Sequence, residues 1–186
     1  MGKSNEPYTI PELNQMVEHY RGTQENRVHS FRLKPHSDDE KKSTKTDWWD
    51  MPLTVCSCGS KKPPYIAESG RNCSALKTPH IVLENAYHSI VNASGLKIGS
   101  IPLGTKPIST VKAALCMSGQ DSFEAGRCAE PHAANRVLND ADKVSKKSHT
   151  LAISDLLFSV ALDARYPIAK PYCVTCRCVF PQLRNK

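Results

Sequence analysis

The sequence predicts an α/β domain that begins near residue 71 and follows a polar N-terminal arm. From Thr78 onward, some segments carry apolar residues at helical spacing, and others are short apolar runs typical of strands. Before residue 70 the chain is polar and repeatedly interrupted by proline and glycine. We therefore expect a largely irregular arm over residues 1–70 and one folded domain over residues 71–186.

The arm carries one predicted helix, over about Pro11–Tyr20, and a pair of tryptophans. Four apolar side chains fall on one face of this helix: Leu13, Met16, Val17 and Tyr20. We expect Trp48 and Trp49 to anchor the arm on the domain, because aromatic side chains bury large apolar areas. A stacking platform for nucleic-acid bases is the alternative.

The first element of the domain is a predicted helix with Thr78 as its N-cap. Pro79 suits the first helical position, and Gly95 can end the helix with a positive φ. Two apolar stretches follow, over residues 96–103 and 109–117, with glycine and proline between them. They predict an antiparallel pair of strands.

A second helix is predicted to begin almost at Cys128, because Pro131 is tolerated only in the first turn of a helix. Residues 151–162 then form an apolar run consistent with a buried strand, although a helix fits the pattern too. A short last element begins at Cys173 and must end at Pro181. The predicted order is therefore helix, strand, strand, helix, strand, helix.

Three cysteines at predicted helix starts could share one metal ion. Cys128 opens one helix, and Cys173 with Cys176 opens another, where free amides and the helix dipole stabilise thiolates. Three thiolates leave a fourth zinc position for a water, whose pKa then falls toward ~7. Glu130 is placed to move protons beside the metal. We predict Zn2+ on the three cysteines and Glu130 as the catalytic residue.

A closed structural zinc site is the alternative for these cysteines. In that arrangement Cys56 and Cys58 would join Cys173 and Cys176 in a four-thiolate site. Cys128 would then be an ordinary packed residue.

The two halves of the motif resemble a known enzyme superfamily. Residues 126–133 read Gly-Arg-Cys-Ala-Glu-Pro-His-Ala and residues 173–176 read Cys-Val-Thr-Cys. This is similar to the cytidine deaminase-like superfamily, and above all to its YwqJ-like toxin-type deaminases, over roughly residues 78–180. The resemblance implies a three-layer α-β-α sandwich with a mixed sheet, and hydrolytic removal of a nucleobase amine. In many relatives the domain is the toxic tip of a secreted bacterial protein, which implies an immunity protein as a partner.

Two features depart from the family pattern. Pro171 is separated from Cys173 by Tyr172, whereas proline usually stands directly before this pair of cysteines. The chain also ends ten residues after Cys176. We therefore expect the C-terminal strands of the usual sheet to be short or missing.

Residues beside the motif predict the substrate contacts. We expect Ala129, His132 and Tyr172 to line the substrate pocket; His132 could also substitute as a ligand, but a pocket role is favoured. Residues 1–70 hold ten basic and ten acidic residues, so the whole net charge of +7 lies in residues 71–186. Such an excess favours a polyanionic partner. Four basic residues are the predicted nucleic-acid contacts: Lys143, Lys146, Lys147 and Arg177.

These patterns predict a zinc-dependent deaminase that acts on cytosine in single-stranded DNA or RNA. Two other functions stay open, namely deamination of a free nucleoside or nucleotide and a non-catalytic, zinc-stabilised module that binds nucleic acid. No apolar run approaches the ~18 residues of a membrane span, and Met1 is followed by polar residues rather than a signal peptide. We expect a cytoplasmic location, or export by a toxin-delivery route.

Overall fold

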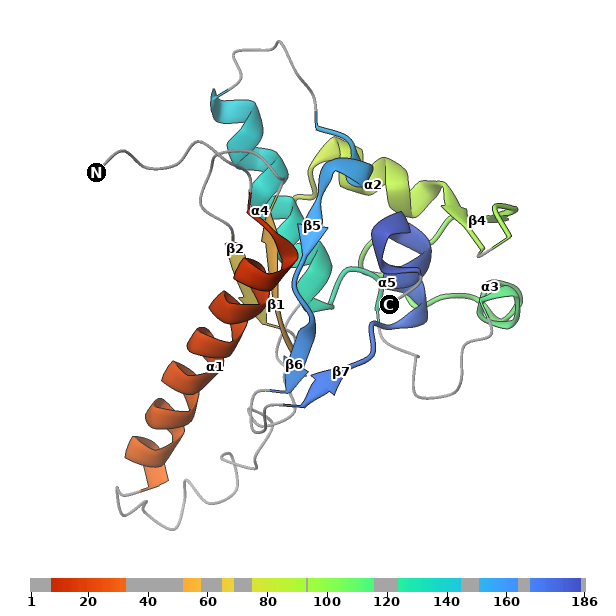
Figure 1. The fold of residues 1–186 in the computed structure, drawn as a ribbon. Helices are drawn as coiled ribbons and strands as arrows, with labels where there is room; N and C mark the ends of the chain where they lie inside the picture. The colour runs from red at the N-terminus through yellow and green to blue at the C-terminus, as the bar shows by residue number, and fades with distance from the viewer. Residues whose placement is uncertain are drawn as a thin grey trace.

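An antiparallel sheet of five short strands forms the centre of the computed structural model (Figure 1). Its strands run in the order β2 (Tyr65–Glu68), β1 (Pro52–Ser57), β6 (Ala161–Asp163) and β7 (Ala169–Lys170), and β5 (Leu157–Phe158) also pairs with β1. The structure describes residues 8–32, 52–57, 65–68, 75–92, 94–115, 124–144, 151–163 and 168–184. The predicted α/β class is confirmed.

Helices cover both faces of this sheet. In β5, Phe158 packs in the larger core with α4 (Ala129–Val144) and α5 (Val174–Val179), whereas its neighbour Leu157 packs against α1 (Ile10–Arg32). In β6, Ala161 likewise packs in the larger core, whereas Leu162 packs against α1. Because neighbouring residues of a strand point to opposite faces, α1 lies on one face and α4 with α5 on the other.

The predicted N-terminal helix is confirmed as α1, and it is longer than the apolar pattern indicates. Thr9 and Glu12 cap it reciprocally, with the Glu12 carboxylate accepting from the Thr9 N–H at 2.7 Å. Leu13 and Val17 are fully buried against Leu162, and Met16 and Tyr20 pack beside them. The predicted apolar face is therefore the buried face. Trp48 and Trp49 lie outside the described residues.

The sheet crosses the boundary predicted near residue 70. β1 and β2 come from the stretch expected to be largely irregular, yet β1 pairs with β5 and β6 near the other end of the chain. A side chain of α1 strengthens this connection, because the Asn14 amide oxygen accepts a hydrogen bond from the Val160 N–H at 2.8 Å. The part of the arm that the structure describes is built into the same sheet as the predicted domain.

The helix α2 (Ile81–His88) is capped by His80, so the prediction of Thr78 as the N-cap was wrong. The His80 Nδ1 accepts from the Val82 N–H at 3.2 Å, which leaves the ring proton on Nε2 to donate to Asp142 at 2.8 Å. Asn135 fixes the same segment, since its side-chain oxygen accepts from the His80 N–H at 2.7 Å. Two residues of α4 therefore set where α2 begins.

The antiparallel pair predicted over residues 96–117 is only partly present. β4 (Lys97–Gly99) pairs with β3 (Ile90–Val91), a strand formed by residues that were expected to continue α2. Gly95, with φ +82°, lies in the turn between these strands rather than at a helix end. The second predicted strand was wrong, because residues 109–114 form α3 (Ser109–Ala114), in which Val111 is buried together with Leu115, four residues further on.

The predicted strand over residues 151–162 is interrupted. It contains a 3-10 turn, η3 (Ile153–Asp155), and then β5 and β6, which are separated where the Val160 N–H binds Asn14 instead of a neighbouring strand. Every strand pair among the described residues is antiparallel, so the predicted mixed sheet is not found there. After α5, Pro181 ends the helix as predicted and starts η4 (Pro181–Leu183).

No helix in the described ranges has the length and apolar character needed to cross a membrane.

Replacing Leu13 with alanine tests whether α1 is part of the fold. Leu13 is fully buried against the sheet, so Leu13→Ala should lower the free energy of unfolding by about 2–5 kcal/mol. Gln15→Ala, on the exposed face of the same helix, should change it by less than about 0.5 kcal/mol. Urea unfolding of both variants makes the comparison. Equal midpoints for the two would mean that α1 does not stabilise the sheet.

Candidate metal centre

Two helix N-termini meet at the three cysteines predicted to bind metal. Cys128 directly precedes α4, Cys173 is the N-cap of α5, and Cys176 lies in the first turn of α5. The Cys173 sulfur accepts a hydrogen bond from the Cys176 N–H at 3.3 Å. A thiol therefore occupies the position where helices usually carry a serine or aspartate cap.

Gly126 allows the chain to turn sharply into α4. Its φ of +84° is a conformation that other residues adopt only under strain, and a Cβ there would come within 2.5 Å of Leu103. Ala125 on its N-terminal side hydrogen-bonds to Gly104 and Thr105, through its carbonyl and its N–H respectively, each at 2.9 Å. This fixed turn places Cys128 at the start of the helix, facing α5.

The three cysteine sulfurs form one compact group. They all lie within 4.8 Å of one another, and the Cys128 and Cys173 sulfurs are only 3.4 Å apart. Cys176 is almost fully buried and the other two are half-buried. Three converging thiols at this separation could hold a metal ion, as predicted for these three residues.

The thiols share their protons unequally. Hydrogen bonds from Cys128 and Cys176 lower the pKa of Cys173 well below its usual value, and backbone N–H groups at the start of α5 assist. A hydrogen bond with Cys173 raises the pKa of Cys128, and a hydrogen bond with Cys128 raises the pKa of Cys176. The group is therefore ready to exchange thiol protons for a cation, which binds only the thiolate form.

Glu130 lies in the first turn of α4, directly beside these sulfurs. It is 4% exposed, and its carboxylate oxygen Oε2 accepts a hydrogen bond from the Cys176 thiol at 3.4 Å. Burial, and then the negative charge of Cys173, raise the pKa of Glu130 to about 7. A carboxyl group with a pKa near neutrality can both accept and return a proton under physiological conditions.

Of the three residues predicted to line a substrate pocket, Ala129 and His132 lie in α4, and Tyr172 lies just before α5. Ala129 is buried at the start of α4, and His132 is half-buried one turn further on, outside the group of converging sulfurs. Tyr172 is buried and its hydroxyl donates to the Ser159 backbone carbonyl. Tyr172 therefore connects the entry of α5 to the β5–β6 segment.

The structure describes two of the four predicted nucleic-acid contacts, Lys143 and Arg177. Lys143 is exposed near the far end of α4 and pairs with Asp140 at 2.9 Å. Arg177 is exposed on α5, where its guanidinium donates to the Arg184 carbonyl at 2.7 Å. Lys146 and Lys147 lie outside the described residues.

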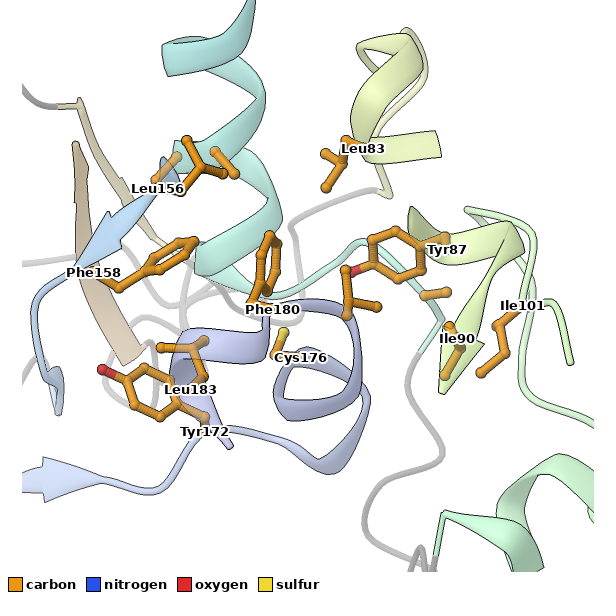
Figure 2. Close-up of a cluster of buried hydrophobic side chains, with 14 of the residues drawn as sticks. Leu83, Tyr87, Ile90, Ile101, Leu156, Phe158, Tyr172, Cys176, Phe180 and Leu183 are labelled. Carbon is orange, nitrogen blue, oxygen red and sulfur yellow. The ribbon is translucent and has the colours of Figure 1, made fainter. Parts of the chain in front are cut away.

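One residue beside the cysteines was missed by the sequence analysis. Tyr87 of α2 is fully buried, and Figure 2 shows it extending toward α5, the helix that carries Cys176. Burial raises the pKa of Tyr87 well above its usual value, and the charges of Cys176, Cys128 and Cys173 raise it further. Its only signal in the sequence is its position four residues after Leu83 on the buried face of α2.

Comparisons of the chain with protein-family models, with curated proteins and with solved structures find no significant match. The argument about function therefore depends on the residues of the centre and on their arrangement.

Serine substitutions test the metal centre directly. Protein purified from zinc-supplemented medium should hold about one metal ion per chain, and Cys128→Ser, Cys173→Ser and Cys176→Ser should each lower that content. Cys178→Ser is the matched control, because Cys178 is also a half-buried free cysteine of α5 but lies outside the group. Metal content is measured by plasma mass spectrometry.

Metal content also distinguishes the three-cysteine centre from the alternative site of four cysteines. Cys56 belongs to β1, and Cys58 lies outside the described residues. Loss of metal from Cys56→Ser and Cys58→Ser, with full retention in Cys128→Ser, would contradict the centre described above.

Proposed function

We propose that the chain is a zinc-dependent hydrolytic deaminase that acts on the exocyclic amine of a nucleobase. The observation that carries this proposal is the contact between the buried Glu130 carboxylate and the thiol of Cys176, inside a group of three converging cysteines. Structural zinc sites are closed by four protein ligands, whereas catalytic sites have three and leave one position open. A buried carboxylate beside three sulfurs is the arrangement that a metal-assisted hydrolase needs.

The donor set fits zinc. Zinc–sulfur bonds of about 2.3 Å in a tetrahedral arrangement place the sulfurs about 3.8 Å apart. The sulfurs here are mutually within 4.8 Å, and those of Cys128 and Cys173, at 3.4 Å, would have to separate by only a few tenths of an ångström. Thiolates favour zinc over magnesium or calcium, which prefer oxygen ligands.

Glu130 is the residue that would move protons in the reaction. When bound, zinc would supply a water of lowered pKa and a Lewis-acidic position for it. Glu130 would accept one proton as the water oxygen bonds to the ring carbon and deliver it to the adjacent ring nitrogen. It would then carry the second proton of the water to the departing amine. The carbon–nitrogen bond then breaks, ammonia leaves, and a carbonyl replaces the amine on the ring.

The order of the elements supports the proposed superfamily. The resemblance implies helix, strand, strand, helix, strand, helix, with the first cysteine at the start of the second of these helices. The chain offers this order in α1, β1, β2, α4, the β5–β6 segment and α5, so the resemblance would begin near residue 10 rather than near residue 78. The segment from α2 to α3 would then be an insertion between β2 and α4. Helices on both faces of the sheet agree with the implied three layers.

The proposed substrate is cytosine in single-stranded DNA or RNA. The support is the excess of positive charge in residues 71–186, which favours a polyanion over a free nucleoside. A toxin role, with an immunity protein as its partner, follows only from the resemblance to YwqJ-like deaminases.

Glu130→Gln tests the proposed chemistry. The amide keeps the size of the side chain but cannot take up a proton, so ammonia release should fall by at least about 100-fold while bound zinc is retained. Asp155→Asn, which removes a carboxylate at an exposed 3-10 turn, is the matched control and should keep its activity. Undiminished deamination by a zinc-loaded Glu130→Gln protein would refute the assigned role.

A substrate panel tests the proposed target. We expect base conversion on single-stranded DNA or RNA, with little conversion of duplex DNA, because the amine must be reached outside the base stack. Sequencing detects conversion in polymers, and ammonia release detects it in cytidine. Conversion of cytidine alone would identify a nucleoside deaminase. Zinc binding without conversion of any substrate would favour a binding module.

A further inference from the structure

We propose that Tyr87 is a positioning residue of the metal centre, with its hydroxyl donating a hydrogen bond to the thiolate ligands and foremost to Cys176. The inference rests on the metal site of the proposed function. Tyr87 would act through Cys176 and would not touch the substrate. It lies on α2, so it adds a third helix to a centre otherwise built from α4 and α5.

The Tyr87 hydroxyl lacks a partner although it is completely buried. Tyr87 is 0% exposed, and its oxygen has no hydrogen-bond partner among the described residues. Leaving a buried hydroxyl unpaired costs about 1–3 kcal/mol, and most buried polar groups do have partners. Phenylalanine would fill the same space without that cost. The unpaired hydroxyl therefore indicates a further hydrogen-bond partner at this place.

The surroundings of the hydroxyl identify that partner. Tyr87 is fully buried, and Cys176 in the first turn of α5 is almost fully buried as well. Tyr87 and Cys176 also belong to one buried cluster, and Figure 2 shows the oxygen end of the ring directed toward α5. A phenol hydroxyl directed at a thiolate binds it as a hydrogen-bond donor.

Metal binding changes Cys176 from a donor into an acceptor. In the structure its thiol donates to Glu130 at 3.4 Å. A metal-bound thiolate has lost that proton, and its negatively charged sulfur accepts hydrogen bonds. A hydrogen bond from the Tyr87 hydroxyl would hold the Cys176 sulfur in position and withdraw negative charge from it. Partners of this kind typically change metal affinity 10–100-fold.

Tyr87→Phe tests the inference, because it removes one oxygen and keeps the ring. In the metal-free protein it should leave stability unchanged or raise it, since the hydroxyl is unpaired there. Zinc affinity, measured by competition with a chelator, should fall about 10–100-fold. In cobalt-substituted protein the thiolate-to-cobalt charge-transfer band should shift, because the sulfur loses a hydrogen bond.

Leu83→Ala is the matched control, one turn earlier on the buried face of α2. It loosens the same packing without removing a donor, so it should lower stability and leave the cobalt band in place. Unchanged zinc affinity in Tyr87→Phe would overturn the inference, as would a weaker affinity with an unshifted band. Failure of the wild-type chain to bind metal would instead refute the proposed function on which the inference rests.

Discussion

The meeting of two helix N-termini is the constraint on which the centre depends. The starts of α4 and α5 both carry partial positive charge, so they repel each other unless negative charge lies between them. The lowered pKa of Cys173 favours one thiolate at this point, with hydrogen bonds from Cys128 and Cys176. A zinc ion with three thiolates would carry a net charge of −1, which the two helix ends would also stabilise. The two helix ends thus favour negative charge between them, whether it lies on the Cys173 thiolate or on a zinc ion with three thiolates.

The composition of the site could be predicted because its determinants are local. Pro131 fixes the start of one helix and Pro181 the end of the other, and the cysteines are close in sequence to these points. Tyr87 could not be predicted in the same way. Its proposed role depends on Cys176, which is far along the chain and on another helix but belongs to the same buried cluster. The sequence pattern around Tyr87 is that of an ordinary core residue.

The fold was predicted less well, for physical reasons that differ between segments. Residues 109–114 have an apolar content that suits a strand, but the spacing of Val111 and Leu115 suits a helix. The segment forms a helix because a helix buries both of these side chains on one face. At the start of α2, Asn135 and Asp142 hold His80 as the cap in place of Thr78. Such tertiary contacts override the local preference of threonine for helix starts. The strands β1 and β2 were missed because short runs beside glycine and proline carry little periodicity.

The pairing of β1 with β5 and β6 has a consequence for synthesis of the chain. About 100 residues separate β1 from β5. At the usual 5–20 residues per second, a ribosome would need on the order of 5–20 s to make them. Throughout that interval the edge of β1 that later binds β5 and β6 would have no strand beside it. An open edge can pair with another chain, so nascent copies on one polysome would be most vulnerable to association before residue 163 has emerged.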